Sequence, residues 1–359
     1  MHINSIYGSG DFCHRKQKIC VIYVNERLKE YLRLGRLFNA EILSLILVLS
    51  YVLSAKLYGI QTDIRILIAL FFGGIFAHIW GGYNNDRMDL SIDKNATYCA
   101  HKPLVSGSIS IKSAKIIEYS ALVTFVGIII FSLYLSRPAF FSLSTLYVCF
   151  YLLGAVALAA FYNRFNKSNM FINITGQMYA TFVVLIGMSL VVNFDKIVFF
   201  SSLVMGLNGI YLNIIEADLK DIEGDIVNVP KALGVRFEGE KALHIFKFYL
   251  VNEGIKIVMF LLVLVVLLLE KASIYYIGIA CILFVINYFV RISMFKHLSP
   301  DREKMKRHIA VQELTSILLI STMYMIIHPL LPVLIVVFVA LWLVLWNKFL
   351  WGTYLRPQV

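Results

Sequence analysis

The sequence predicts an all-α membrane protein, a polytopic bundle of nine or ten transmembrane helices. Hydrophobic residues make up 59% of the 359 residues and charged residues 15%, against about 45–50% and about 25% in soluble domains. Apolar stretches of about 20 residues, the length that spans a bilayer as a helix, recur along the chain. Basic residues gather in alternate connections between these stretches. The composition therefore excludes a soluble globular protein, a disordered chain and a disulfide scaffold.

The apolar stretches give ten candidate spans. The last two are separated only by His328 and Pro329, which either join two spans or interrupt one. The candidate spans cover residues 40–60, 64–83, 116–136, 139–161, 171–193, 196–215, 245–269, 273–295, 310–327 and 329–350.

The distribution of charge indicates which side each connection faces. With the N-terminus in the cytoplasm, 25 of the 33 Lys and Arg residues lie in inner segments and five in outer loops. Cytoplasmic loops of membrane proteins carry such an excess of basic residues. Topology thus accounts for the net charge of +11, and we expect no nucleic-acid partner. The longer polar connections face the cytoplasm, so we expect the active site at that side of the cell membrane.

Two acidic clusters follow the second and sixth spans. Both have the pattern D-x-x-D-x-x-x-D, which places three carboxylates on one face of a continuing helix. Their mutual repulsion requires positive charge nearby, and Mg²⁺ pairs carboxylates with substrate phosphates. A solvated helix end would explain one such cluster, but the repetition favours magnesium on either side of a diphosphate. The clusters are Asp86, Asp89 and Asp93, and Asp218, Asp221 and Asp225.

Around these clusters the sequence resembles the UbiA-type intramembrane prenyltransferases, over residues 30–310. The family's N-D-x-x-D-x-x-x-D begins here at Asn85, and Asn213 stands at the upstream asparagine of its second signature. Lys102–Gly107 reads K-P-L-V-S-G, where the family has R-P-L-x-S-G. Arg36–Asn39 is similar to the family's R-P-x-N without the proline, and Tyr162–Lys167 is similar to its Y-x-x-x-x-K.

The resemblance implies a helical bundle around a central cavity and an enzyme that moves a polyprenyl group from an allylic prenyl diphosphate to an acceptor. It implies Mg²⁺ as cofactor, held by all six aspartates, and catalytic roles for Asp86, Asp89, Asp218 and Asp221. The substrate-binding residues that it implies are Asn39, Asn85, Lys102, Tyr162, Arg164, Lys167 and Asn213.

The same resemblance suggests a division of the chain and a class of acceptor. Residues 1–39 form a basic cytoplasmic segment, 40–310 the prenyltransferase domain, and 311–359 the C-terminal spans and tail. We expect an aromatic acceptor, as in quinone biosynthesis, with a glycerol-phosphate lipid precursor, as in archaeal-type ether lipid synthesis, as the alternative. A cation transporter is the alternative from another functional class, but transporters place such carboxylates near the bilayer midplane.

Three of the ionisable residues inside the predicted spans are candidates for a specific role. His78 precedes Asn85 by two helical turns and lies toward the face of the first acidic cluster, where it either contacts a substrate or packs as a hydrogen-bonded histidine. Glu253 and Lys256 are three positions apart in the seventh span. This spacing suits an internal ion pair.

Overall fold

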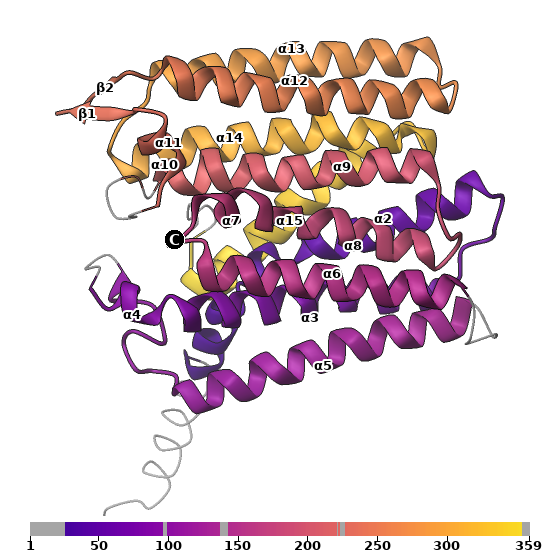
Figure 1. Ribbon diagram of the computed structural model, residues 1–359, viewed down its shortest axis with the longest axis horizontal. Helices are drawn as coiled ribbons and strands as arrows, with labels where there is room; N and C mark the ends of the chain where they lie inside the picture. Colours follow the sequence, from indigo (N-terminus) through magenta and orange to yellow (C-terminus); the bar gives the residue numbers. More distant parts are fainter. Residues whose placement is uncertain (1–25, 96–98, 137–142, 221, 223–226, 354–359) are drawn as a thin grey trace, which may run out of the picture.

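The protein is described from a computed structural model, which covers residues 26–95, 99–136, 143–220, 222 and 227–353. Within these residues, ten helices are long and apolar enough to cross a membrane. The all-α class is therefore confirmed, with the larger of the two predicted numbers of spans. The helices run side by side, roughly parallel to the long axis of the bundle (Figure 1).

The spans follow the predicted ranges closely, and four of them contain a 3-10 or π-helical turn. The ten spans are η1–α2 (Leu37–Asn39, Ala40–Leu57), α3 (Ile64–Met88), α5 (Ile111–Ser136), α6 (Leu143–Phe165), α7–η3–α8 (Met170–Thr175, Gly176–Met178, Tyr179–Ser189), α9–η4 (Lys196–Tyr211, Leu212–Ala217), α12 (Phe246–Leu269), α13 (Ile274–Lys296), α14–η5 (Arg302–Ser321, Thr322–Ile326) and α15 (Leu331–Trp351).

The short elements lie at one end of the bundle, on the left in Figure 1. They follow the second and sixth spans, which carry the acidic clusters. Strands β1 and β2 form an antiparallel hairpin in which Phe237 pairs with Ala242. These elements are α4 (Leu90–Asp93), α10 (Asp218–Lys220), α11 (Val229–Ala232), β1 (Arg236–Glu238) and β2 (Lys241–Leu243).

At the opposite end, the loops are short and aspartates begin the next helix. The side chain of Asp63 accepts a hydrogen bond of 2.8 Å from the backbone N–H of Arg65 at the start of α3. Asp195 accepts the backbone N–H groups of Ile197 and Val198 at the start of α9. Each carboxylate accepts hydrogen bonds from backbone N–H groups that the first helical turn leaves unpaired. Its negative charge also interacts favourably with the positive end of the helix dipole.

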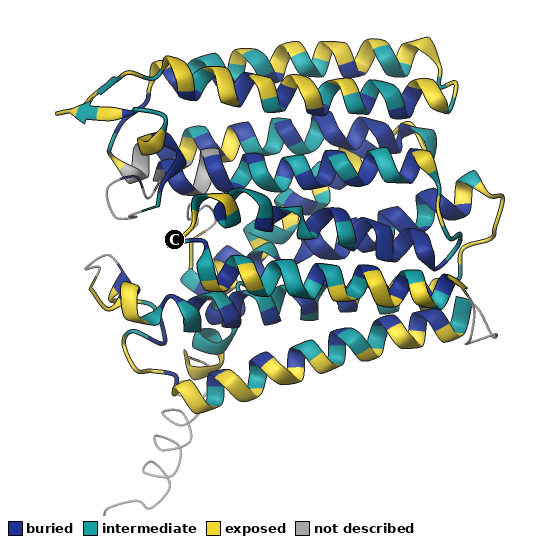
Figure 2. Ribbon diagram, in the orientation of Figure 1, coloured by how far each residue is buried: buried dark blue, intermediate teal, exposed yellow. Residues whose placement is uncertain are grey.

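Helix α2 is the centre of the bundle and is buried along most of its length (Figure 2). Glycines on its two neighbours allow the backbones to approach closely. A Cβ at Gly74 of α3 would fall on the backbone of Ser44, and one at Gly187 of α8 would fall on Ser50 and 2.8 Å from the carbonyl oxygen of Leu47. Small residues are the usual means by which membrane helices come into van der Waals contact.

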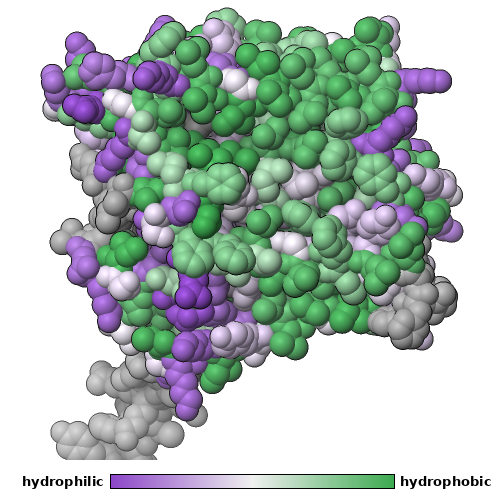
Figure 3. All heavy atoms as spheres, in the orientation of Figure 1, coloured by the Kyte–Doolittle hydropathy of each residue, from purple (hydrophilic) through white to green (hydrophobic). Residues whose placement is uncertain are grey.

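The outer surface of the bundle is apolar. Large hydrophobic side chains are exposed along α5, α12, α13 and α15. Figure 3 shows hydrophobic atoms over the middle of the molecule and hydrophilic atoms gathered toward its two ends. A soluble protein does not expose an apolar surface of this extent. With the ten apolar spans, this surface identifies an integral membrane protein.

A buried polar cluster joins α12, α13 and α14. Arg291 donates two hydrogen bonds of 2.8 Å to the carboxylate of Glu253. Lys256 donates to the hydroxyl of Ser316 at 2.7 Å. The partner of Glu253 is therefore Arg291, 38 positions away, and the predicted pairing of Glu253 with Lys256 is not the one observed. An arginine fork satisfies both carboxylate oxygens, which a lysine three residues away cannot do.

Candidate functional site

One pocket lies at the end of the bundle that carries the short elements, and both acidic clusters contribute to it. Its cavity volume is about 340 Å³. Asp89 and Asp93 of the first cluster and Asp218 of the second cluster line it. Asp86, the remaining described aspartate of the clusters, lies beside this lining through its partner Arg36. The two clusters therefore face a common space. Asp221 and Asp225 lie outside the described residues.

The first acidic cluster sits where α3 gives way to α4. The carboxylate of Asp86 accepts a hydrogen bond of 2.6 Å from Nη2 of Arg36, and Nζ of Lys102 lies 3.8 Å from the same oxygen. Arg36 has a φ of 49°, in the left-handed region that non-glycine residues rarely adopt. Such a conformation costs about 1–3 kcal/mol and concentrates at functional sites. The turn that presents Arg36 is therefore held in place by its surroundings.

The other two aspartates of this cluster also face basic side chains. Nζ of Lys102 donates to Asp93 at 2.7 Å, and Nζ of Lys167 lies 3.7 Å from Asp89. Burial raises the pKa of Asp89 to about 6, although the charge of Lys167 opposes the shift. At neutral pH the carboxylate form of Asp89 therefore prevails. Each described acid of the first cluster thus has a cation supplied by the chain.

The second cluster is shaped by the π-helix η4. Its backbone hydrogen bond runs from the N–H of Asp218 to the carbonyl of Asn213. Residues five apart are stacked in a π-helix, whereas in an α-helix they point about 140° apart. Asn213 and Asp218 consequently reach the same side chain, Asn173, with hydrogen bonds of 2.7 Å and 3.2 Å. The backbone N–H of Val229 also donates to Asp218, at 2.9 Å.

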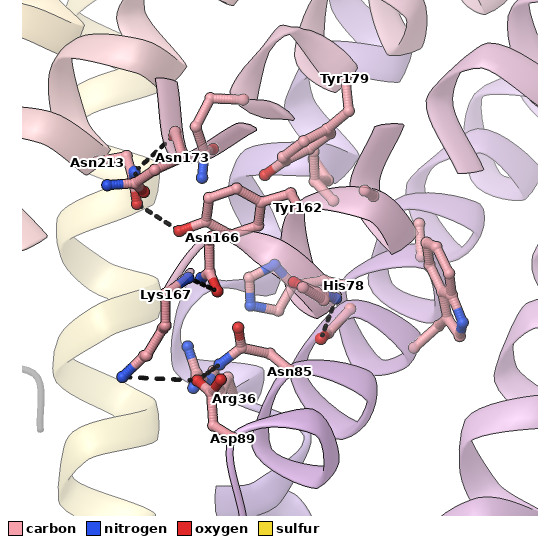
Figure 4. A pocket seen from close by; sticks show the side chains of 18 of the residues that line it. Arg36, His78, Asn85, Asp89, Tyr162, Asn166, Lys167, Asn173, Tyr179 and Asn213 are labelled. Atoms are coloured by element: carbon pink, nitrogen blue, oxygen red, sulfur yellow. Dashed lines mark hydrogen bonds and ion pairs between the residues drawn. The ribbon is translucent and has the colours of Figure 1, made fainter. Parts of the chain in front are cut away.

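Tyr162 connects the fourth span to this second cluster. Its hydroxyl donates to Oδ1 of Asn213 at 2.5 Å. Figure 4 shows Tyr162 and Asn213 on one side of the pocket, and Arg36, Asn85 and Asp89 on the other. The side chain of Asn85 itself donates to Asp89 at 3.4 Å.

Five of the seven predicted substrate-binding residues line this pocket, and two do not. Asn85, Lys102, Tyr162, Lys167 and Asn213 line it. Arg164 is exposed and stacks over the ring of Phe165, with 5.3 Å from the guanidinium carbon to the ring centroid. Asn39, at the end of η1, does not line the pocket either. Arg164 lies in the last turn of α6, whereas Lys167 follows the end of that helix. Residues three apart share a face only where the helix continues, so the two side chains point in different directions.

His78 lines the pocket, as its spacing from Asn85 suggests. It lies against the backbone of Arg36, and its buried Nε2 has no hydrogen-bond partner among the described residues. Beyond it the wall becomes apolar. The side chains of this part of the wall are Leu43, Ala77, Phe125, Ala155 and Val183.

A further buried polar network, which the sequence analysis did not identify, lies behind the first cluster. Glu118 on α5 accepts hydrogen bonds from Asn84 at 2.7 Å and from Arg87 at 2.6 and 2.9 Å. Asn163 of α6 donates to the side-chain oxygen of Asn84 at 3.0 Å. These polar residues hold α3, α5 and α6 together around Asp86. A lone glutamate in an apolar span was the available signal.

The chemistry of the lining fits magnesium. Carboxylate and amide oxygens are the ligands that Mg²⁺ prefers, and Asp89, Asp93, Asp218, Asn85 and Asn213 turn such oxygens toward one pocket. Among the described residues, however, no three His, Cys, Asp or Glu side chains are grouped closely enough to bind a metal ion as they stand. The aspartates instead contact basic and amide groups, which would have to yield to the ion.

Comparison with known proteins gives a family for the chain and similar folds among solved structures. A model of the UbiA prenyltransferase family matches residues 44–310, whereas no curated protein sequence matches the chain. A solved structure of a digeranylgeranylglyceryl phosphate synthase is 19% identical, with a TM-score of 0.58 over 84% of this chain and 98% of the other.

Two further solved structures are similar to the same extent. A UbiA homolog from Archaeoglobus fulgidus, bound to GPP and Mg²⁺, is 17% identical, with a TM-score of 0.56 over 83% of this chain and 99% of that one. A UbiA homolog from Aeropyrum pernix K1 is 12% identical, with a TM-score of 0.56 over 79% of this chain and 97% of that one. At these identities the likeness concerns the fold.

Proposed function

Because the chain belongs to the UbiA prenyltransferase family, we propose that it transfers a polyprenyl group from an allylic prenyl diphosphate to an acceptor within the membrane. The observation that carries the proposal is the single pocket lined by carboxylates of both acidic clusters and by three basic side chains, Arg36, Lys102 and Lys167. Anionic and cationic groups converging in this way suit a diphosphate and its metal ions better than they suit a transported cation alone.

The diphosphate would lie at the polar end of the pocket and the prenyl chain along the apolar wall. Asp86, Asp89, Asp93 and Asp218, with Asp221 and Asp225, would hold Mg²⁺. When bound, magnesium supplies positive charge that neutralises the departing diphosphate. Arg36, Lys102 and Lys167 lie within 4 Å of these carboxylates. They would therefore be close enough to contact the phosphate oxygens if the carboxylates bound the metal instead.

Transfer then requires the allylic C–O bond to break, the acceptor to attack the resulting carbocation, and the proton on the attacked atom to pass to the released diphosphate. The diphosphate takes the electron pair of the broken bond, and the basic side chains stabilise the charge that develops on it. The apolar wall that includes Phe125 and Val183 keeps water from the cation. Without this exclusion the cation would be hydrolysed.

We propose an aromatic acceptor that carries no phosphate. The three basic side chains of the described lining are those that contact the aspartates, and the diphosphate would engage all of them. A glycerol-phosphate acceptor would bring a second strongly charged group into the same low-dielectric space, which is costly without a cation of its own. The described lining offers an aromatic acceptor Tyr162, Tyr179 and Trp80 instead. We further propose that the pocket opens to the cytoplasmic side of the cell membrane, as the excess of inner basic residues suggests.

The proposal is tested with purified protein in lipid nanodiscs, radiolabelled geranylgeranyl diphosphate, Mg²⁺ and a panel of acceptors that includes 4-hydroxybenzoate and glycerol-phosphate lipid precursors. We expect Asp89→Asn to lower turnover at least about 100-fold, because it removes a metal-binding charge. The matched control is Asp63→Asn, on the same helix at its far end, where the side chain caps α3. Asp63→Asn should keep normal turnover.

Near-normal transfer by Asp89→Asn would count against the proposed role. Transfer to glycerol-phosphate precursors alone would correct the class of acceptor. Magnesium binding that is unaffected by a non-hydrolysable prenyl diphosphate, measured by isothermal titration, would favour the transporter over the enzyme.

A further inference from the structure

The tenth span, α15, lies beyond the residues that the family model matches, yet it contacts the turn next to Arg36. Nε1–H of Trp342 donates a hydrogen bond of 2.8 Å to the carbonyl of Leu37. The ring of Trp351 meets the ring of Phe38 edge-on, with 5.1 Å between centroids. Helix α15, yellow in Figure 1, is thus packed against η1 at the start of the first span.

Contacts from α15 reach the chain on both sides of Arg36. Arg33, one turn earlier, donates to the carbonyl of Leu350 and lies over the ring of Trp351, 6.0 Å from its centroid. Leu37 and Phe38 follow Arg36 directly. A residue with φ of 49° needs such contacts, because the left-handed conformation persists only where the surroundings hold it.

Trp342 also contacts the helix that carries the partner of Arg36. Its ring packs edge-on against Phe71 of α3, with 6.1 Å between centroids. Asp86, near the end of α3, accepts the hydrogen bond of 2.6 Å from Arg36. One side chain of α15 therefore fixes the turn before the first span relative to the second span, and these two elements carry the two members of this ion pair.

We propose that α15 is a positioning element for the diphosphate end of the site. Through Trp342 and Trp351 it holds the turn that presents Arg36 to Asp86 and, in the reaction proposed above, to the diphosphate. The inference rests on that proposed function. It assigns to the C-terminal span the role of holding Arg36 in place, which neither acidic cluster performs.

The test is Trp342→Phe, which keeps the ring and removes the N–H donor. We expect kcat/KM for geranylgeranyl diphosphate to fall about three- to tenfold, the factor that corresponds to one hydrogen bond. The fall should lie mainly in KM for the diphosphate, with KM for the acceptor unchanged. In an Arg36→Ala background, Trp342→Phe should change kcat/KM by less than about twofold, because the two side chains act through one interaction.

The matched control is Trp346→Phe on the same helix. Trp346 contacts the rings of Trp342 and Phe349, and within the part of the chain that the structure describes no hydrogen bond joins it to η1, so its variant should keep both KM values. If Trp342→Phe does not fold, Trp351→Leu replaces it in the same cycle with Arg36→Ala.

An effect of equal size with and without Arg36, or no effect on KM for the diphosphate, would overturn the positioning role while leaving the enzyme intact. A chain that, without substitutions, neither binds nor transfers prenyl diphosphate would overturn the proposed function and this inference with it.

Discussion

Replacement of Glu118 by alanine tests how the first acidic cluster is held in place. Glu118 is 1% exposed, and it accepts three hydrogen bonds of 2.6 to 2.9 Å from Asn84 and Arg87, which flank Asp86 in the sequence. Removing one partner of a buried ion pair costs about 3–5 kcal/mol, because the other charge stays buried and unpaired. The side chain of Arg87 retains 16% exposure, so we expect about 3 kcal/mol, at the lower end of this range.

The free energy of unfolding of the Glu118→Ala variant is measured in mixed micelles with a rising fraction of denaturing detergent. Glu118→Gln keeps an acceptor for Asn84 and should lose about half as much. Lys115→Ala, one turn away on the same helix and exposed, serves as the control and should change little. A loss below about 1 kcal/mol for Glu118→Ala, the value of an exposed pair, would refute the reasoning.

Two further predictions concern helix packing and the second acidic cluster. Gly74→Ala should destabilise the protein by several kcal/mol or prevent folding, whereas Gly127→Ala, whose Cβ meets nothing within 4 Å, should be tolerated; equal unfolding temperatures would contradict the close approach of α2 and α3. Asn173→Ala should weaken magnesium binding or lower turnover about 10- to 100-fold by releasing Asp218, with a small change in unfolding temperature. Thr175→Ala, which removes a half-buried hydroxyl that donates to the backbone of Phe171 on the same helix, is the control, and an equal loss in both variants would contradict the assigned contact.

The spans and the first acidic cluster could be predicted from the sequence because both depend on local pattern. An apolar stretch of sufficient length spans a bilayer whatever it packs against. Asp86, Asp89 and Asp93 follow one another within two helical turns, so their proximity needs no knowledge of the fold. Arg164 shows the limit of local reasoning, because its direction depends on where α6 ends.

Contacts between distant spans could not be predicted in the same way. Glu118 finds Asn84 across 34 positions, and Trp342 finds Leu37 across 305. These pairings depend on which faces of the helices meet, and hydrophobicity alone does not decide this where lipid solvates every span equally well. The observed pairing of Glu253 with Arg291 could not be predicted for the same reason, since Arg291 lies on a different helix.

The widened turn at Leu212–Ala217 has a consequence for comparing chains of this kind. Loss of a single residue there would return the helix to regular winding and would leave the asparagine and the aspartate four positions apart, a spacing that keeps two side chains on one face of an α-helix. The acidic side chain would therefore keep its direction, although the segment would be one residue shorter. A one-residue gap at this point of an alignment is thus compatible with the same arrangement of acidic residues, and such chains should be aligned on the asparagine and the aspartate rather than on the residues between them.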